Sequence, residues 1–257
     1  MDINNKNIVL TGASSGIGLA ILKLLLGYRS VRIVAVARHI ETIPSVDGVV
    51  FPFSADLSNE SGVDCLFEYT QSLFGDIDIF IANAGYAYLE KLSNPDWKHI
   101  ENIFALNTFS PIYSLQKLAK QDVNKSTCFV STISGVAQVS LPYYSLYCST
   151  KAALHQFIEA YRYESSPKLH IMAVYPVATR TSFFEKAANE KQPPIPFLSQ
   201  SSDTVAKAII RGIEKDKKQV YPSFLFRIFK IIGQNFPFIF SLYSLSEKRK
   251  VDKNLHL

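Results

Sequence analysis

The chain alternates short β-branched runs with helix-like segments, and this alternation constrains its fold more than any other feature. The strand-like runs are NIVLTG, VRIVAVAR, VVFPFSADL, IDIFIANAG, TCFVSTISG and LHIMAVYP. Strands that alternate with helices predict a parallel sheet covered on both faces. Right-handed crossovers then arrange the chain as a doubly wound, Rossmann-type α/β fold. A chain of 257 residues with 47% hydrophobic content is long enough to form it as one large domain.

Two segments depart from this alternation. Residues 182–200 contain three prolines and no clear period, so we expect a long substrate loop or lid there. Residues 223–257 follow the catalytic domain expected over 1–222 as a hydrophobic C-terminal extension. The run WKHIENIFALNTFSPIYSLQKLAKQ predicts a long helix with a kink at Pro111, and the first helix is expected to end at Gly27.

Charge and cysteine content exclude several classes of protein. The net charge of +5 comes without a Lys/Arg cluster in the first 200 residues, which argues against nucleic-acid binding. Cys65, Cys128 and Cys148 are odd in number and lack metal-ligand spacing, so we expect reduced thiols, no metal and a cytoplasmic protein. The polar start MDINNKN argues against secretion.

A glycine-rich loop, TGASSGIG, follows the first strand and opens a helix. Glycines at 12, 16 and 18 allow a sharp turn and the close approach of a ligand. A helix start offers free N–H groups and a partial positive charge, which suit a pyrophosphate. The spacing is GxxxGxG, and a plain strand-to-helix turn is the alternative. The strand–loop–helix context favours dinucleotide binding.

The end of the second strand indicates which dinucleotide is bound. An acid at this point would hold the ribose 2′-hydroxyl of NAD. Here Ala37 takes that place and Arg38 follows, an arrangement that would accept a 2′-phosphate. We therefore expect NADPH to be preferred, with NAD still possible because Glu41 is close. In the alternative, Arg38 is only a solvated charge.

Tyr147 and Lys151 stand four residues apart on a predicted helix, so they share one face. A free phenol has a pKa of about 10, and a neighbouring ammonium would lower it toward the range useful for proton transfer. Such a pair also occurs by chance on helix surfaces. Ser134 and Asn107 favour a catalytic role for the pair over a chance surface contact. Ser134 ends a predicted strand at the edge of the sheet where ligands bind, and a buried Asn107 needs hydrogen-bond partners.

These motifs, in this order, resemble the short-chain dehydrogenase/reductase family over residues 6 to 220. The resemblance rests on TGASSGIG, ADL at 55–57, NAG at 83–85, Asn107, Ser134, YCSTK and YPVATRT. It implies an oxidoreductase that moves a hydride between a nicotinamide and a carbonyl or alcohol carbon.

The resemblance also implies roles for individual residues. Tyr147 would be the acid/base, Lys151 would lower its pKa and bind the nicotinamide ribose, and Ser134 would stabilise the substrate oxygen. Asn107 would hold a water that links Lys151 to solvent. The implied cofactor-binding residues are Gly12, Ser14, Ser15, Gly16, Ile17, Gly18, Arg38, Asp56, Leu57, Asn83, Ala84, Gly85, Tyr147, Lys151, Pro176, Thr179 and Thr181.

Three departures from the family pattern stand out. Ala82 replaces the first Asn of Asn-Asn-Ala-Gly, which leaves the chemistry intact. Val177 follows Pro176 where Gly is usual, so the backbone beside the nicotinamide is less permissive. The hydrophobic extension is absent from many members.

The segments expected around the substrate are apolar, which favours an apolar carbonyl compound or secondary alcohol over a sugar phosphate. They supply Val136, Val139, Leu141, Tyr143, Tyr144, Phe183, Phe184 and Phe197, although ordinary packing would explain these side chains equally well.

The extension begins with an amphipathic helix, Ser223–Gln234, that is too short and too interrupted to span a bilayer. Three alternatives stay open for residues 223–250. They contact the inner face of a membrane, where SEKRK would meet anionic head groups; or they cover the substrate cleft; or they contact a second subunit.

The sequence thus predicts an NADP(H)-dependent carbonyl reductase, a homodimer or homotetramer packed through its two long helices. The alternative is a catalytically silent regulator that binds NADP(H); the complete set of Asn107, Ser134, Tyr147 and Lys151 favours the enzyme.

Overall fold

A computed structural model of the chain describes residues 1–121, 124–188 and 199–255. Within these residues, seven strands form one parallel sheet in the order β3-β2-β1-β4-β5-β6-β9. The strands are β1 Asn7–Thr11, β2 Arg32–Ala37, β3 Val50–Ser54, β4 Ile79–Ala82, β5 Thr127–Thr132, β6 Leu169–Val174 and β9 Gln219–Val220. This order confirms the predicted doubly wound fold.

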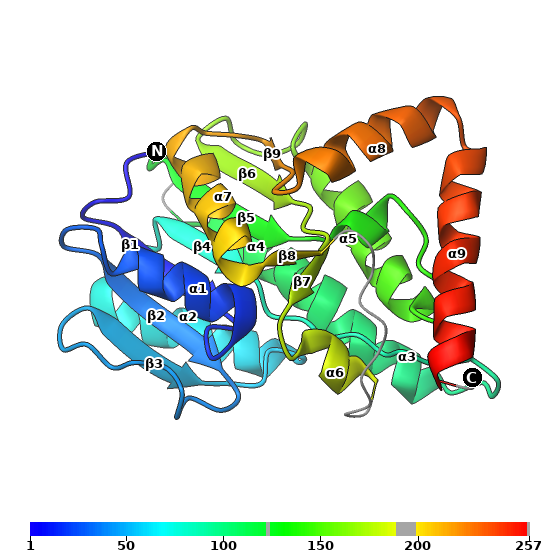
Figure 1. The fold of residues 1–257 in the computed structure, drawn as a ribbon. Helices are drawn as coiled ribbons and strands as arrows, with labels where there is room; N and C mark the ends of the chain where they lie inside the picture. Colours follow the sequence, from blue (N-terminus) through cyan, green and yellow to red (C-terminus); the bar gives the residue numbers. More distant parts are fainter. Residues whose placement is uncertain (122–123, 189–198, 256–257) are drawn as a thin grey trace.

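Helices cover both faces of the sheet (Figure 1). One face carries α1 Gly16–Leu25 and α7 Ser202–Glu214, and the other carries α2 Glu60–Phe74, α4 Ser110–Ala119 and α5 Ser145–Tyr161. Side chains alternate between the two faces along each strand. In β2, Ile33 and Ala35 belong to the core below α1 and α7, whereas Val34 and Val36 belong to the opposite core. Burial on both faces explains why the strands are almost entirely apolar.

The predicted long helix contains a local change of winding before Pro111. It comprises α3 Trp97–Phe104, a π-helical turn over Ala105–Phe109, and then α4. Proline has no N–H, so Pro111 cannot donate a hydrogen bond to the carbonyl of Asn107. The helical turn just before Pro111 accommodates one extra residue and becomes a π turn. The expected kink therefore takes the form of a π turn, and Asn107 lies within it.

The segment expected as a loop contains short regular elements. α6 spans Phe183–Ala187, and a small two-stranded sheet pairs β7 Ala178–Arg180 with β8 Ser199–Ser201. Residues 189–198, including the predicted pocket residue Phe197, lie outside the described residues. The pairing of β7 with β8 brings the two ends of this segment together.

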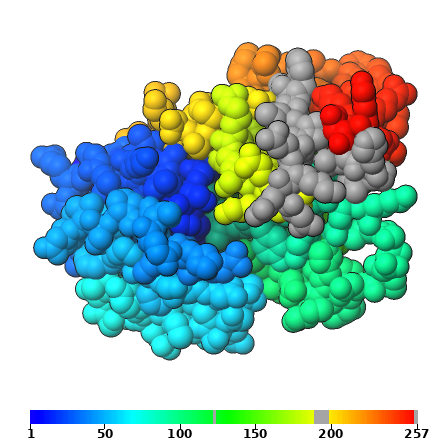
Figure 2. Space-filling view, turned by 60° about the horizontal axis from the view of Figure 1, so that its bottom comes forward, coloured from blue at the N-terminus to red at the C-terminus, as the bar shows by residue number. Residues whose placement is uncertain are grey.

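The extension folds as two helices, α8 Phe224–Asn235 and α9 Phe238–Leu255. They stand beside α5 at the end of the molecule opposite β2 and β3, as Figures 1 and 2 show. The expected amphipathic helix is present as α8, with the Ser223 hydroxyl accepting from the N–H of Phe226 at its start. In the part of the chain that the structure describes, no helix is both long and apolar enough to cross a bilayer.

Candidate active site

A cleft of about 750 Å³ lies at the carboxyl ends of the strands. The structure brings most of the sequence-predicted residues to its wall. Two are exceptions: Gly18 and Asn107 lie behind the lining residues. The residues that reach the wall are Gly12, Ser14, Ser15, Gly16, Ile17, Arg38, Asp56, Leu57, Asn83, Ala84, Gly85, Ser134, Tyr147, Lys151, Pro176, Thr179 and Thr181.

The glycine-rich loop has the backbone that the sequence predicts. Gly12 has a φ of +67°, which side chains rarely adopt, and a Cβ on Gly18 would lie 1.9 Å from the carbonyl oxygen of Gly12. The N-cap of α1, Ser15, makes no side-chain hydrogen bond to the first turn. The N–H groups of this turn therefore have no side-chain cap, and the loop suits an anionic phosphate group.

The cleft next to the end of β2 contains a cation, Arg38. Arg38 and His39 line it, whereas Glu41, the nearest acid in sequence, does not. Asp56 lines the cleft too, and the backbone N–H of Ser58 donates to its carboxylate at 2.9 Å. That hydrogen bond and the nearby Arg38 lower the pKa of Asp56. Arg38 fits a 2′-phosphate better than a bare 2′-hydroxyl.

Asn83 joins three strands at this edge, which sequence reasoning did not predict. Its backbone follows β4, its side-chain amide donates to the carbonyl of Thr11 at 3.3 Å, and its side-chain oxygen accepts from Thr132 at 3.3 Å. Asn83 therefore holds the ends of β1 and β5 together and fixes the shape of the cleft wall.

Tyr147 and Lys151 are both buried on one face of α5, as predicted. The Nζ of Lys151 lies 5.9 Å from the centre of the Tyr147 ring and donates to the carbonyl of Thr132 at 3.0 Å. Burial lowers the pKa of Lys151 to about 8, because the charged form loses its hydration.

The expected depression of the Tyr147 pKa is not what the protein alone produces. Burial raises the pKa of this phenol above its ordinary value, and the hydrogen bond from the side chain of Ser134 opposes that rise only in part. The expectation considered the neighbouring cation, whereas the loss of hydration is the larger effect here.

Ser134 adopts an unusual backbone conformation, with a φ of +139°. It precedes a 3₁₀ turn at Gly135–Ala137, and the N–H of Gly135 donates to the carbonyl of Pro176 at 2.8 Å. A non-glycine residue in this region costs on the order of 1–3 kcal/mol, so surrounding contacts have to maintain it.

Asn107 is fully buried, and its side chain is satisfied by protein groups. The amide nitrogen donates to the carbonyl of Tyr86 at 2.8 Å and to the hydroxyl of Thr150 at 3.2 Å, and the amide oxygen accepts from the N–H of Tyr86 at 3.0 Å. These contacts fix the strand end that carries Gly85, where a Cβ would lie 2.9 Å from the Asn107 side-chain oxygen.

The other half of the cleft is mainly apolar. Of the residues expected there, Val136, Val139, Leu141, Phe183 and Phe184 line it. Tyr143 and Tyr144 do not, contrary to expectation: the Tyr143 hydroxyl bonds Asp252 of α9, and the Tyr144 ring packs edge-on against Phe184. These directions depend on tertiary packing, which the segment alone does not indicate.

Sequence reasoning did not assign five aromatic residues that line the cleft. Tyr86 and Tyr88 follow the NAG motif, and Phe226, Phe229 and Tyr243 belong to the extension. The three-residue spacing of Phe226 and Phe229, which puts both rings on one face of α8, was the sequence signal that could have predicted their place in the cleft. The extension thus covers the substrate half of the cleft, which was one of its three predicted placements.

Comparison with known proteins agrees with this geometry. The model of the short chain dehydrogenase family matches residues 6–192. A protein of Arabidopsis thaliana, 11-beta-hydroxysteroid dehydrogenase-like 3, is 30% identical over 232 residues, which cover 85% of this chain and 74% of that protein. A fatty acyl-CoA reductase of Mycobacterium tuberculosis is 33% identical over 165 residues, 60% of this chain; the match spans just over half of that protein, 56%.

Among solved structures, a short-chain dehydrogenase from Sphingobium yanoikuyae in complex with NADPH superposes with a TM-score of 0.75 at 23% identity, covering 91% of this chain and 95% of that one. The fold and the cleft are those of a dinucleotide-binding oxidoreductase domain. The chain belongs to the short-chain dehydrogenase family. The predicted family, fold and class of enzyme are thereby confirmed.

Proposed function

We propose that this protein is an NADP(H)-dependent oxidoreductase that interconverts a carbonyl and a secondary alcohol on an apolar, lipid-like substrate. The observation that carries the proposal is the buried pair of Tyr147 and Lys151 at the junction of two dissimilar halves of one cleft. One half has the glycine-rich loop and Arg38, and the other has aromatic and aliphatic walls.

The residues of the first half fit a phosphorylated dinucleotide. The N–H groups at the start of α1 would hold the pyrophosphate, and Arg38 would pair with the 2′-phosphate. Lys151 would bind the nicotinamide ribose. NADPH, when bound, supplies the hydride for carbonyl reduction. The NADPH named for the Sphingobium structure supports this choice, and NAD remains an alternative for the assay below.

Tyr147 would donate the proton to the carbonyl oxygen. Because burial raises the pKa of Tyr147, the phenol is protonated at neutral pH, as a proton donor must be. Ser134 would donate a hydrogen bond to the same substrate oxygen as it gains charge. A water held by the main-chain carbonyl of Asn107, which has no N–H of residue 111 to bind, would pass a proton from solvent to Lys151, whose pKa is about 8. Lys151 would in turn restore the proton that Tyr147 gives to the substrate.

The apolar half of the cleft supports a lipid-like substrate. Its wall includes many apolar or aromatic side chains and an exposed lysine, Lys186. The names of the two relatives, a fatty acyl-CoA reductase and an 11-beta-hydroxysteroid dehydrogenase-like protein, agree with this substrate class. The wall residues named here are Val136, Val139, Leu141, Phe183, Phe184, Phe226 and Phe229.

An assay of NADPH and NADH consumption against ketones, aldehydes and 3-oxoacyl compounds of graded chain length tests the proposal. We expect oxidation of NADPH to exceed that of NADH and to increase with chain length until the cleft is filled. Tight NADPH binding without turnover on any of these compounds would favour a catalytically silent regulator instead.

We further propose that the outer face of the extension rests on the inner face of a membrane. Apolar side chains are exposed on that face: Phe224, Leu225, Ile228, Ile231, Ile232, Phe236, Phe238, Leu242 and Leu245. The extension also carries six Lys or Arg residues against two acidic ones, which suits anionic head groups. A cytoplasmic enzyme would thereby reach a lipid-like substrate.

Flotation with anionic liposomes tests this contact. Removing the whole extension would also open the cleft, so the better variant is Leu225→Glu with Ile232→Glu, which changes only exposed positions. We expect this variant to lose most of its liposome binding, whereas Val46→Glu, an exposed site beside β3, should keep it. Equal flotation of both proteins would refute the membrane contact.

The long helices offer a surface for self-association. Trp97 of α3 is 84% exposed and Phe109 is 56% exposed, which is unusual for large apolar side chains. We propose a homodimer or homotetramer packed through α3–α4 and α5. Light scattering of the wild type and of Trp97→Asp with Phe109→Asp measures the mass; a monomeric wild type would exclude the assembly.

A further inference from the structure

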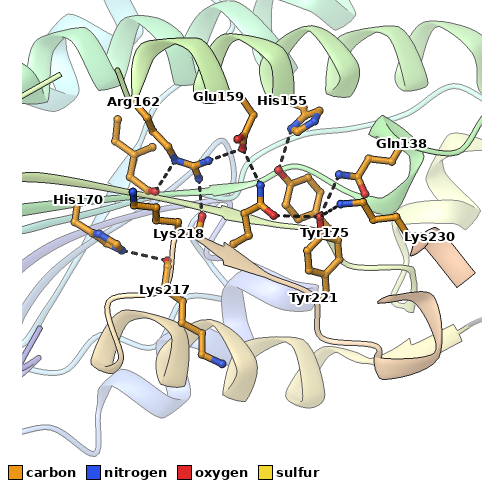
Figure 3. Close-up of polar contacts among 12 residues, drawn as sticks. Gln138, His155, Glu159, Arg162, His170, Tyr175, Lys217, Lys218, Tyr221 and Lys230 are labelled. Carbon is orange, nitrogen blue, oxygen red and sulfur yellow. Dashed lines mark hydrogen bonds and ion pairs between the residues drawn. The ribbon is translucent and has the colours of Figure 1, made fainter. Parts of the chain in front are cut away.

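The turn that carries Ser134 contacts the extension at one end and Tyr221, just before the extension, at the other. At the first end, the ring of Phe226 covers Gly135 so closely that a Cβ there would lie 2.7 Å from a ring carbon. At the second end, the side-chain amide of Gln138 donates to the hydroxyl of Tyr221 at 3.2 Å (Figure 3). Tyr221 lies two residues before Ser223, where the extension begins, and Phe226 lies in the first turn of α8.

Tyr221 is itself held by several groups. Its ring stacks on that of Tyr175 with centroids 4.7 Å apart, and its hydroxyl accepts from the Nζ of Lys230 at 2.7 Å. The hydroxyl of Tyr175 meets the Nδ1 of His155 at 2.9 Å, as Figure 3 shows. His155 lies on α5, four residues after Lys151. The network therefore connects α8, the end of β6 and the helix that carries Tyr147.

The backbone of the turn is bonded at Gly135, whose N–H donates to the carbonyl of Pro176 at 2.8 Å, but the side chain of Ser134 has only long hydrogen bonds within the turn and to Pro176. The side-chain oxygen of Ser134 lies 3.4 Å from the N–H of Val136 and 3.5 Å from the carbonyl of Pro176. Its φ of +139° adds strain. A strained residue whose side chain is weakly bonded keeps its position only when neighbouring groups determine it. Phe226 and Tyr221 are the neighbours on the side of the extension.

We infer that Phe226 and Tyr221 are positioning residues: they hold the Ser134 turn in its active geometry, so the extension is a working part of the catalytic site. The inference rests on the proposed function, in which Ser134 binds the substrate oxygen. It deepens that function, because a displacement of about 1 Å at a catalytic group can lower the rate on the order of 100-fold.

The test measures variants that alter these contacts in two backgrounds, the wild type and Ser134→Ala. Tyr221→Phe keeps the stacked ring and removes the hydroxyl that accepts from Gln138 and Lys230. Phe226→Leu removes the ring over Gly135. Tyr163→Phe, at a tyrosine that is 93% exposed, and Gln234→Ala, at an exposed position of α8, are the matched controls.

We expect kcat for carbonyl reduction to fall about 10-fold in Tyr221→Phe and more in Phe226→Leu, with the affinity for NADPH unchanged. In the Ser134→Ala background, the same two substitutions should change kcat by less than about 2-fold, because the group that they position is gone. Full additivity of the effects in the double variants would overturn the inference.

A second measurement does not depend on turnover. Amide hydrogen exchange at residues 136–139 should accelerate in Tyr221→Phe and Phe226→Leu and stay unchanged in Tyr163→Phe and Gln234→Ala. If the protein reduces none of the test compounds, the proposed function fails while this measurement still decides whether the extension holds the turn. Unchanged exchange in both variants would contradict the inference.

Discussion

The Nζ of Lys151 lies 5.9 Å from the centre of the Tyr147 ring, yet its hydrogen bond goes to the carbonyl of Thr132. The cation is therefore fixed by the end of β5 and stands beside the phenol without bonding it. This arrangement keeps the two groups in register on α5 and leaves the phenol hydroxyl for Ser134 and a substrate. Both groups also lose hydration because they are buried, which raises the pKa of Tyr147 and lowers the pKa of Lys151.

Lys151 should reduce the stability of the protein. Its folded pKa of about 8 lies below its ordinary value of 10.5, so between these pH values the unfolded chain binds more protons and stability rises with pH. Below about pH 8 the penalty is complete. Lys151→Met should therefore raise the free energy of unfolding at pH 7 by about 2 kcal/mol, after allowance for the lost hydrogen bond to Thr132.

Urea unfolding at pH 7 and pH 10 measures this effect. The gain from Lys151→Met should shrink at pH 10, and Lys207→Met, at an exposed lysine, should give no comparable gain. A gain that stays constant with pH would show that the charge of Lys151 is not its source.

Arg38 should determine the choice between the two dinucleotides. Arg38→Ala removes the cation at the end of β2, so the Kd for NADPH should rise about 10-fold to 100-fold while the Kd for NADH stays nearly constant. Combining Ala37→Asp with Arg38→Ala should improve NADH binding, because an acid can bind the ribose hydroxyl. Fluorescence titration gives both constants, with Arg211→Ala as the control. Equal losses for NADPH and NADH would argue against a 2′-phosphate contact.

Gly18 should be intolerant of any side chain although it does not line the cleft. A Cβ there would lie 1.9 Å from the carbonyl oxygen of Gly12, so the loop backbone has to move. Gly18→Ala should weaken NADPH binding at least about 10-fold. Gly27→Ala, where the nearest contact is 3.3 Å, should bind normally. Calorimetric titration of both variants checks this, and normal binding by Gly18→Ala would mean that the loop does not hold the cofactor.

Local pattern accounts for the parts of the structure that were predicted from sequence. Alternating burial along β2 and the glycines of the first loop act over a few residues, and the carboxyl-edge rule placed Ser134 and Gly85 correctly. The direction of the Tyr147 pKa shift, the side chains of Tyr143 and Tyr144 and the position of Phe226 depend on contacts between segments far apart in the chain. Periodicity within one segment carries no information about such contacts.

The central claim is that Tyr147 is the proton donor, and Tyr147→Phe tests it most directly. The matched control is Tyr144→Phe, a buried neighbour that does not line the cleft. The measurement is single-turnover oxidation of NADPH on the best substrate, together with the Kd for NADPH. We predict that Tyr147→Phe lowers the rate about 10³-fold or more with Kd within about 2-fold, while Tyr144→Phe keeps the rate. A Tyr147→Phe variant that retains the wild-type rate would contradict the account.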